Sequence, residues 1–109
     1  MYLRGLFGSE AAEKVLLFIE NYGDGYAKKI ADTFKMSVSQ AQKQLLKFER
    51  EGIIASRLQG RTRVYVWNPR FMFLKELRAL LKKELTFLPE AMTEEYFRAR
   101  MRPRRSGKP

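Results

Sequence analysis

The sequence predicts a mainly α-helical domain that carries one two-stranded β-hairpin. Apolar residues recur at helical spacing in residues 9–22, 26–51 and 71–88. Between residues 53 and 67 the pattern changes to an alternation that is rich in β-branched and aromatic residues. The chain has 109 residues, of which 45% are hydrophobic, so we expect a single domain with a buried core.

The first of these helices is predicted to begin at Ser9, because a serine hydroxyl can accept a hydrogen bond from a free backbone N–H. A turn rich in asparagine, aspartate and glycine at residues 21–25 ends it. Its apolar stripe comprises Ala12, Val15, Leu16, Ile19 and Tyr22. Leu17 and Phe18 widen the apolar surface beyond this stripe.

Residues 26–51 are predicted to form two short helices joined by a tight link. In the first, the residues at helical spacing are Tyr26, Ala27, Ile30, Ala31 and Phe34. Ser37 is well placed to cap the second helix, residues 38–51, and Gly52 to end it. In that second helix we expect the core-facing residues to be Val38, Ala41, Leu45 and Phe48. This arrangement is a helix-turn-helix signature, with residues 38–51 as the candidate recognition helix.

The opposite face of the recognition helix is polar. Lys43 lies opposite the apolar face, flanked by Ser39, Gln40, Leu46 and Lys47. A glutamine amide can pair with adenine and a lysine can donate to guanine, so Ser39, Gln40 and Lys43 are candidates for contacts with base edges. The alternative is an ordinary pair of amphipathic helices with a solvated polar face.

Residues 53–67 are predicted to form a hairpin with Gly60 in its loop at residues 59–62. Arg57, Arg61 and Arg63 are expected close together at its tip. A basic hairpin directly after a recognition helix is the wing of a winged helix. Charge that merely prevents strand edges from pairing is the alternative. The expected DNA-contacting residues are Ser37, Ser39, Gln40, Lys43 and Lys47, Lys28 and Lys29 of the preceding helix, and Arg57, Arg61 and Arg63.

The long helix at residues 71–88 has an apolar surface too broad for one packing seam. We expect part of it to pack on the winged domain beside the first helix. The remainder is expected to form a homodimer interface, to which two residues of the first helix are also assigned. The residues assigned to this interface are Leu17, Phe18, Leu77, Leu81, Leu85 and Leu88. The alternative is that the final segment covers it. The predicted organisation is a winged domain at residues 1–88, a short helical extension at 89–102 and a disordered basic tail at 103–109.

Composition excludes several classes of function. The chain contains no cysteine and no histidine, so we expect no disulfide, no metal, no cofactor and no enzyme activity, and a reducing cytoplasm is the natural setting. No apolar run is long enough to span a membrane. The formal net charge is +10, and residues 98–109 hold six basic residues and no acidic one. This excess favours a polyanionic partner.

Over residues 6–85, the order of helices and wing resembles ArsR-type winged helix-turn-helix regulators. It is closer still to winged-helix modules fused to, or encoded beside, minimal nucleotidyltransferases. The matching segments are residues 6–9, 30–31, 36–39, 51–54, 60–61, 64–65 and 68–69, with Leu45, Phe48, Arg57 and Leu77. The chain lacks the cysteine and histidine ligands of metal-sensing members, and it has no nucleotidyltransferase motif.

The predicted function is therefore that of a regulator of transcription that binds double-stranded DNA as a homodimer. Two other functions stay open at this point. The chain could be a protein-interaction module that docks a separate enzyme, such as a nucleotidyltransferase. It could also be an RNA-associated basic protein, whose arginine-rich tail would provide the attraction.

Overall fold

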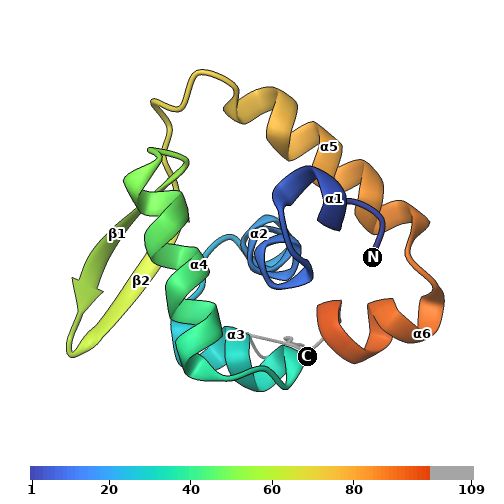
Figure 1. Ribbon diagram of the computed structural model, residues 1–109, viewed down its shortest axis with the longest axis horizontal. Coiled ribbons are helices and arrows are strands. Elements are labelled where there is room, and N and C mark those ends of the chain that lie inside the picture. The colour runs from blue at the N-terminus through green and yellow to red at the C-terminus, as the bar shows by residue number, and fades with distance from the viewer. Residues whose placement is uncertain (99–109) are drawn as a thin grey trace, which may run out of the picture.

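The computed structural model describes residues 1–98, so the predicted basic tail at 103–109 and the end of the 89–102 extension lie outside the described residues. The elements along the chain are α1 (Arg4–Phe7), α2 (Glu10–Tyr22), α3 (Ala27–Phe34), α4 (Val38–Arg50), β1 (Ile54–Gln59), β2 (Thr62–Trp67), α5 (Leu74–Phe87), α6 (Glu90–Met92) and the π-helical turn η1 (Thr93–Phe97). Figure 1 shows α2 near the centre, with α5 along one side and the hairpin at the outer edge beyond α4.

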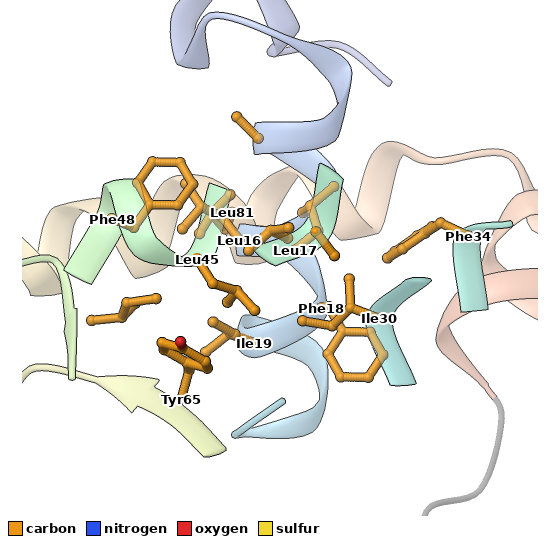
Figure 2. Packing of buried hydrophobic residues seen from close by; sticks show 14 of the residues in the cluster. Leu16, Leu17, Phe18, Ile19, Ile30, Phe34, Leu45, Phe48, Tyr65 and Leu81 are labelled. Atoms are coloured by element: carbon orange, nitrogen blue, oxygen red, sulfur yellow. The ribbon is translucent and has the colours of Figure 1, made fainter. Parts of the chain in front are cut away.

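Helix α2 is the centre of the core. Ser9 caps it as predicted, with its Oγ accepting from the Ala12 N–H at 3.0 Å. Every residue from 15 to 19 is buried, because α2 packs against α1, α3, α4, α5, β2 and η1. Figure 2 shows Leu16, Leu17, Phe18 and Ile19 pointing into this shared core.

The assignment of α2 residues to a dimer interface is therefore wrong. Leu17 and Phe18 are both 0% exposed, and the ring of Phe18 lies 4.6 Å from that of Tyr22 and 6.3 Å from that of Phe34, centroid to centroid. The apolar surface that seemed too wide for one face serves several neighbours within the same chain. These side chains have no surface left for a second copy.

The helix-turn-helix forms where the sequence predicts it. Lys35, at φ 59°, takes the left-handed conformation that ends α3. Ser37 then caps α4, and Ala41, Leu45 and Phe48 are buried as expected. Val38 is a correction, since it is 46% exposed at the first turn of α4, beyond the reach of the core.

The hairpin is also confirmed, with a tight turn at Gly60 and Arg61. Its antiparallel register pairs Ile54 with Trp67 and Gln59 with Thr62, and Gly60 adopts a φ of 65°. Strand β2 is further held by Gly25, which exchanges two backbone hydrogen bonds with Tyr65 at 2.8 and 3.0 Å.

Helix α5 packs on α2, as expected for part of its apolar surface, and this packing corrects the assignment of Leu81 and Leu88 to a dimer interface. Leu81 is 0% and Leu88 7% exposed, and both belong to the core of the chain. Leu77 and Leu85 are half-buried against the same core. Four large apolar side chains of α5 and the segment before it stay exposed, namely Met72, Phe73, Leu80 and Phe87.

The final segment packs elsewhere. The Tyr22 hydroxyl donates to the Tyr96 carbonyl at 2.7 Å, and the Asn21 amide donates to the Phe97 carbonyl at 2.8 Å. The rings of Tyr96 and Phe97 also lie against Phe34 of α3. The extension therefore closes the end of α2 and α3 and leaves apolar side chains of α5 exposed.

A buried pair of carboxyl groups joins α2 to α5. Glu13 is 0% and Glu84 4% exposed. The Oε2 of Glu84 accepts the Tyr2 backbone N–H at 2.8 Å, and the Oε2 of Glu13 accepts that of Leu3 at 2.9 Å. The pKa of Glu84 is raised to about 7, mainly by burial and secondly by a side-chain hydrogen bond to Glu13. Two carboxyl groups can hydrogen-bond to one another only if one of them holds a proton.

Candidate nucleic-acid interface

The outer face of α4 is polar and exposed, while its inner face is locked into the core. Ser39, Gln40 and Lys43 are all exposed. They lie opposite the buried Ala41 and Leu45, so the packing that holds the helix also fixes which way this face points. An α-helix presented in this way has the dimensions that fit the DNA major groove.

The first turn of α4 is organised by a reciprocal capping box. The Gln40 backbone N–H donates to Ser37 Oγ at 3.0 Å, and the Ser37 N–H donates to Gln40 Oε1 at 3.4 Å. The amide oxygen of Gln40 is therefore partly engaged. To contact adenine through both the oxygen and the nitrogen of its amide, Gln40 would have to give up the 3.4 Å hydrogen bond from the Ser37 N–H.

Two exposed apolar residues flank the polar face, and sequence reasoning did not give them a role at the interface. Val38 is 46% and Leu46 47% exposed. Apolar side chains can contact the methyl group of thymine in the major groove. Val38 was missed because its place in the helical repeat is close to that of the core residues.

A basic groove runs along one side of α4. It has a volume of about 410 Å³ and is lined by Gly8, Ser9, Lys43, Gln44, Leu46, Lys47 and Arg50. The Lys47 ammonium sits 4.9 Å from the centroid of the Phe48 ring, which favours the cation in that position. Arg50 adds a third positive charge that sequence reasoning did not assign.

The two lysines of α3 differ in their surroundings. Lys28 forms an exposed ion pair with Asp32 at 3.3 Å, an interaction that is weak in water. Lys29 is half-buried, and its backbone carbonyl accepts from the Thr33 hydroxyl at 2.8 Å. Part of the Lys28 charge is therefore balanced within the chain.

The wing arginines around the hairpin turn do not share one face of the hairpin. Arg57 lies opposite Val64, and Arg63 lies opposite Leu58. Because side chains alternate along a strand, these cross-strand pairs are on opposite faces of the hairpin. Arg61 is at the turn itself and exposed. Arg63 is further held by a 3.1 Å hydrogen bond from its Nη1 to Ser56 Oγ.

Tyr65 and Trp67 are 1% and 8% exposed, so both aromatic side chains of β2 pack in the core. Among residues 1–98, no helix is both long and apolar enough to cross a membrane.

Comparisons with known proteins give structural likeness without sequence relatives. No protein-family model and no curated protein matches the sequence. A mutant of Lactococcus lactis ZitR in its apo form matches with a TM-score of 0.54 at 18% identity, over 78% of this chain and 73% of that one. The MarR family transcriptional regulator SPO1453 from Silicibacter pomeroyi matches with a TM-score of 0.54 at 17% identity, over 85% and 68%.

A third structure is a mutant of S. aureus MepR bound to an oligodeoxyribonucleotide. It matches with a TM-score of 0.55 at 16% identity, over 85% of this chain and 75% of that one. The chain has the winged helix-turn-helix fold. At these identities the likeness shows the fold alone, and the predicted resemblance to ArsR-type regulators and to nucleotidyltransferase-associated modules stays a prediction.

Proposed function

We propose that this chain is a transcriptional regulator that binds double-stranded DNA through α4 and the wing. The observation that carries the proposal is the outer face of α4, where Ser39, Gln40 and Lys43 are exposed while the opposite face is buried in the core. In this arrangement α4 enters the major groove, and Lys43 donates to acceptors on guanine. The DNA-bound state of the structurally similar MepR supports this reading.

The flanking cations supply contacts with phosphates. Lys47 and Arg50 line the groove beside α4, and Lys28 and Lys29 lie on α3. Arg61 at the hairpin turn reaches the backbone or the adjacent minor groove, and Arg57 and Arg63 on the two strands supply further positive charge. Such contacts orient the protein on the duplex without reading its sequence.

The regulator acts as a homodimer in this proposal, through the apolar side chains that the core of the chain leaves exposed. Leu80 and Phe87 of α5 are 37% and 63% exposed, and Tyr2 beside them is 61% exposed. They line an apolar groove of about 360 Å³. Exposed apolar surface of this kind marks interaction sites, and a twofold dimer would place two copies of α4 on successive major grooves. A reducing cytoplasm and an ArsR-type or related regulatory role belong to this same proposal.

The test compares two lysines of equal charge on different faces. Lys43→Ala should weaken binding to a duplex selected by the protein by roughly 1–3 kcal/mol, with relaxed preference at one or two base pairs. Lys82→Ala, at an exposed position of α5, should leave that preference unchanged. Fluorescence anisotropy with labelled duplexes measures both.

Competition with structured RNA separates the remaining alternatives. The proposal predicts that duplex DNA competes and that structured RNA does not, because the major groove of A-form RNA is too narrow for an α-helix. Equal duplex affinity for both lysine variants, or stronger competition by RNA, would overturn the proposal. Absence of duplex binding together with a stoichiometric protein partner would support the protein-interaction module.

A further inference from the structure

Two side chains of α4 hold the hairpin at one place. The Gln42 amide donates from Nε2 to the Tyr65 hydroxyl at 3.0 Å. The Ser56 hydroxyl donates to Glu49 Oε2 at 2.6 Å, a short bond of the kind expected for an O–H donor and a carboxylate. Both hydrogen bonds connect the recognition helix to the wing, and all four residues are at least partly shielded from water.

These two bonds share a geometry. Gln42 and Glu49 are seven residues apart, which is close to two helical turns, so they lie on the same side of α4. Ser56 and Tyr65 are directly paired across the two strands. One stripe of the helix therefore contacts one cross-strand pair of the hairpin.

That cross-strand pair is itself fixed to the core. Tyr65 is 1% exposed, and both its backbone N–H and its carbonyl are bonded to Gly25. The hydroxyl of a ring held in this way has little freedom, so the position of Gln42 is set relative to the core. Ser56 also accepts from Arg63, which keeps that guanidinium beside the contact.

We propose that Gln42, Glu49, Ser56 and Tyr65 form a helix–wing clamp, which sets where the tip of the wing meets DNA relative to α4. This inference rests on the proposed DNA-binding function. The clamp residues are positioning residues, since Gln42 and Glu49 face the hairpin and lie to one side of Lys43.

Because the wing is long, a small tilt at the clamp moves its tip by a large distance. Gly60 lies four residues after Ser56, which is roughly 13 Å along the strand. A tilt of about 10° at the clamp would move the tip by roughly 2 Å over this length. A displacement of that size breaks a hydrogen bond to a phosphate, whose donor–acceptor distance has a tolerance of a few tenths of an ångström.

The experiment is a double-mutant cycle between the clamp and the tip. Ser56→Ala with Tyr65→Phe removes both hydroxyl groups and keeps the buried ring. In the wild-type background, Arg61→Ala should weaken duplex binding roughly tenfold. In the background without the clamp it should weaken binding by less than about twofold, because the tip no longer rests on the DNA. Lys43→Ala is the matched control, and its effect should be the same in both backgrounds.

A structural role alone would lower stability without this selective coupling, so thermal unfolding is measured for each variant. Glu49→Gln keeps an oxygen that accepts from Ser56, and it should preserve the coupling to Arg61. Tyr65→Phe alone serves if the double variant does not fold, and it should reduce the effect of Arg61→Ala in part.

The outcomes separate the two proposals. Arg61→Ala could lower duplex affinity equally with and without the clamp, while Lys43→Ala still weakens binding. That result overturns the clamp but not the proposed DNA-binding function. The clamp is also overturned if, in the wild-type background, Arg61→Ala leaves duplex binding unchanged while Lys43→Ala weakens it. If neither variant changes duplex binding in the wild type, the proposed function itself fails.

Discussion

The stability of this protein should fall as the pH rises from 4.5 to about 7, because Glu84 is buried next to Glu13. The pKa of Glu84 is raised from 4.5 to about 7 by burial and by its hydrogen bond to Glu13. Between these two values the folded chain holds a proton that the unfolded chain has lost. The free energy of unfolding must therefore decrease as the pH rises across this window.

The size of the effect follows from the same shift. A change from 4.5 to about 7 corresponds to roughly 3 kcal/mol between the lower and upper ends of the window. Glu84→Gln replaces the protonated carboxyl with a neutral amide of the same shape, which can still accept from the Tyr2 N–H. The variant should lack this pH-dependent loss and should be more stable than the wild type at pH 8.

Urea unfolding at intervals from pH 4.5 to pH 8 measures the effect. Glu76→Gln is the control, since Glu76 is an exposed carboxylate on the same helix. The informative quantity is the difference in the free energy of unfolding between Glu84→Gln and the wild type at each pH. If that difference stays constant across the window, the raised pKa of Glu84 has no effect on stability and this prediction is wrong.

Three further predictions concern the wing, the core and the exposed face of α5. Arg61→Ala should reduce the slope of log affinity against log salt concentration by about one unit, and an unchanged slope would place the hairpin turn away from phosphates. Gly25→Ala should cost about 1–3 kcal/mol in urea unfolding, because an added Cβ would lie 2.9 Å from Cδ1 of Phe18; a variant as stable as the wild type would mean that this ring can move aside. Leu81→Asp should not fold, since Leu81 is 0% exposed, whereas Phe87→Asp should fold as a monomer in analytical ultracentrifugation. A dimeric Phe87→Asp variant would exclude this face of α5 as the interface.

Local features of the fold could be predicted because their causes are local. Ser9 and Ser37 cap helices through their own side chains, and Gly52 supplies the positive φ that follows α4. The hairpin follows from strand-forming residues on both sides of Gly60. Each of these signals lies within a few residues of the structure that it determines.

Features that depend on the number of neighbours could not be predicted in this way. Helical periodicity identified Leu17 and Phe18 as apolar, but it does not say that α2 is enclosed by the rest of the chain. The same limit applies to Leu81, which could face a partner or the core. Glu13 and Glu84 are distant in sequence, and nothing near either residue indicates that they meet.

At the candidate interface, the direction of each side chain depended on register and packing. The outer face of α4 follows from periodicity, so the exposure of Ser39 and Lys43 was foreseeable. The separation of Arg57 from Arg63 follows only when the hairpin turn is known to contain two residues. Arg50 was overlooked because it stands near the end of the helix, where the sequence gives no sign of the groove beside it.

The most direct test of the central claim is a selection of bound duplexes from a random-sequence DNA pool, carried out with the wild type and with Lys43→Ala. The wild type should enrich a palindromic site, with half-sites about one helical turn apart. Lys43→Ala should enrich a site that has lost preference at one or two positions in each half. A wild-type pool that stays random after repeated rounds, or the same consensus from both proteins, would contradict the claim that α4 reads the major groove.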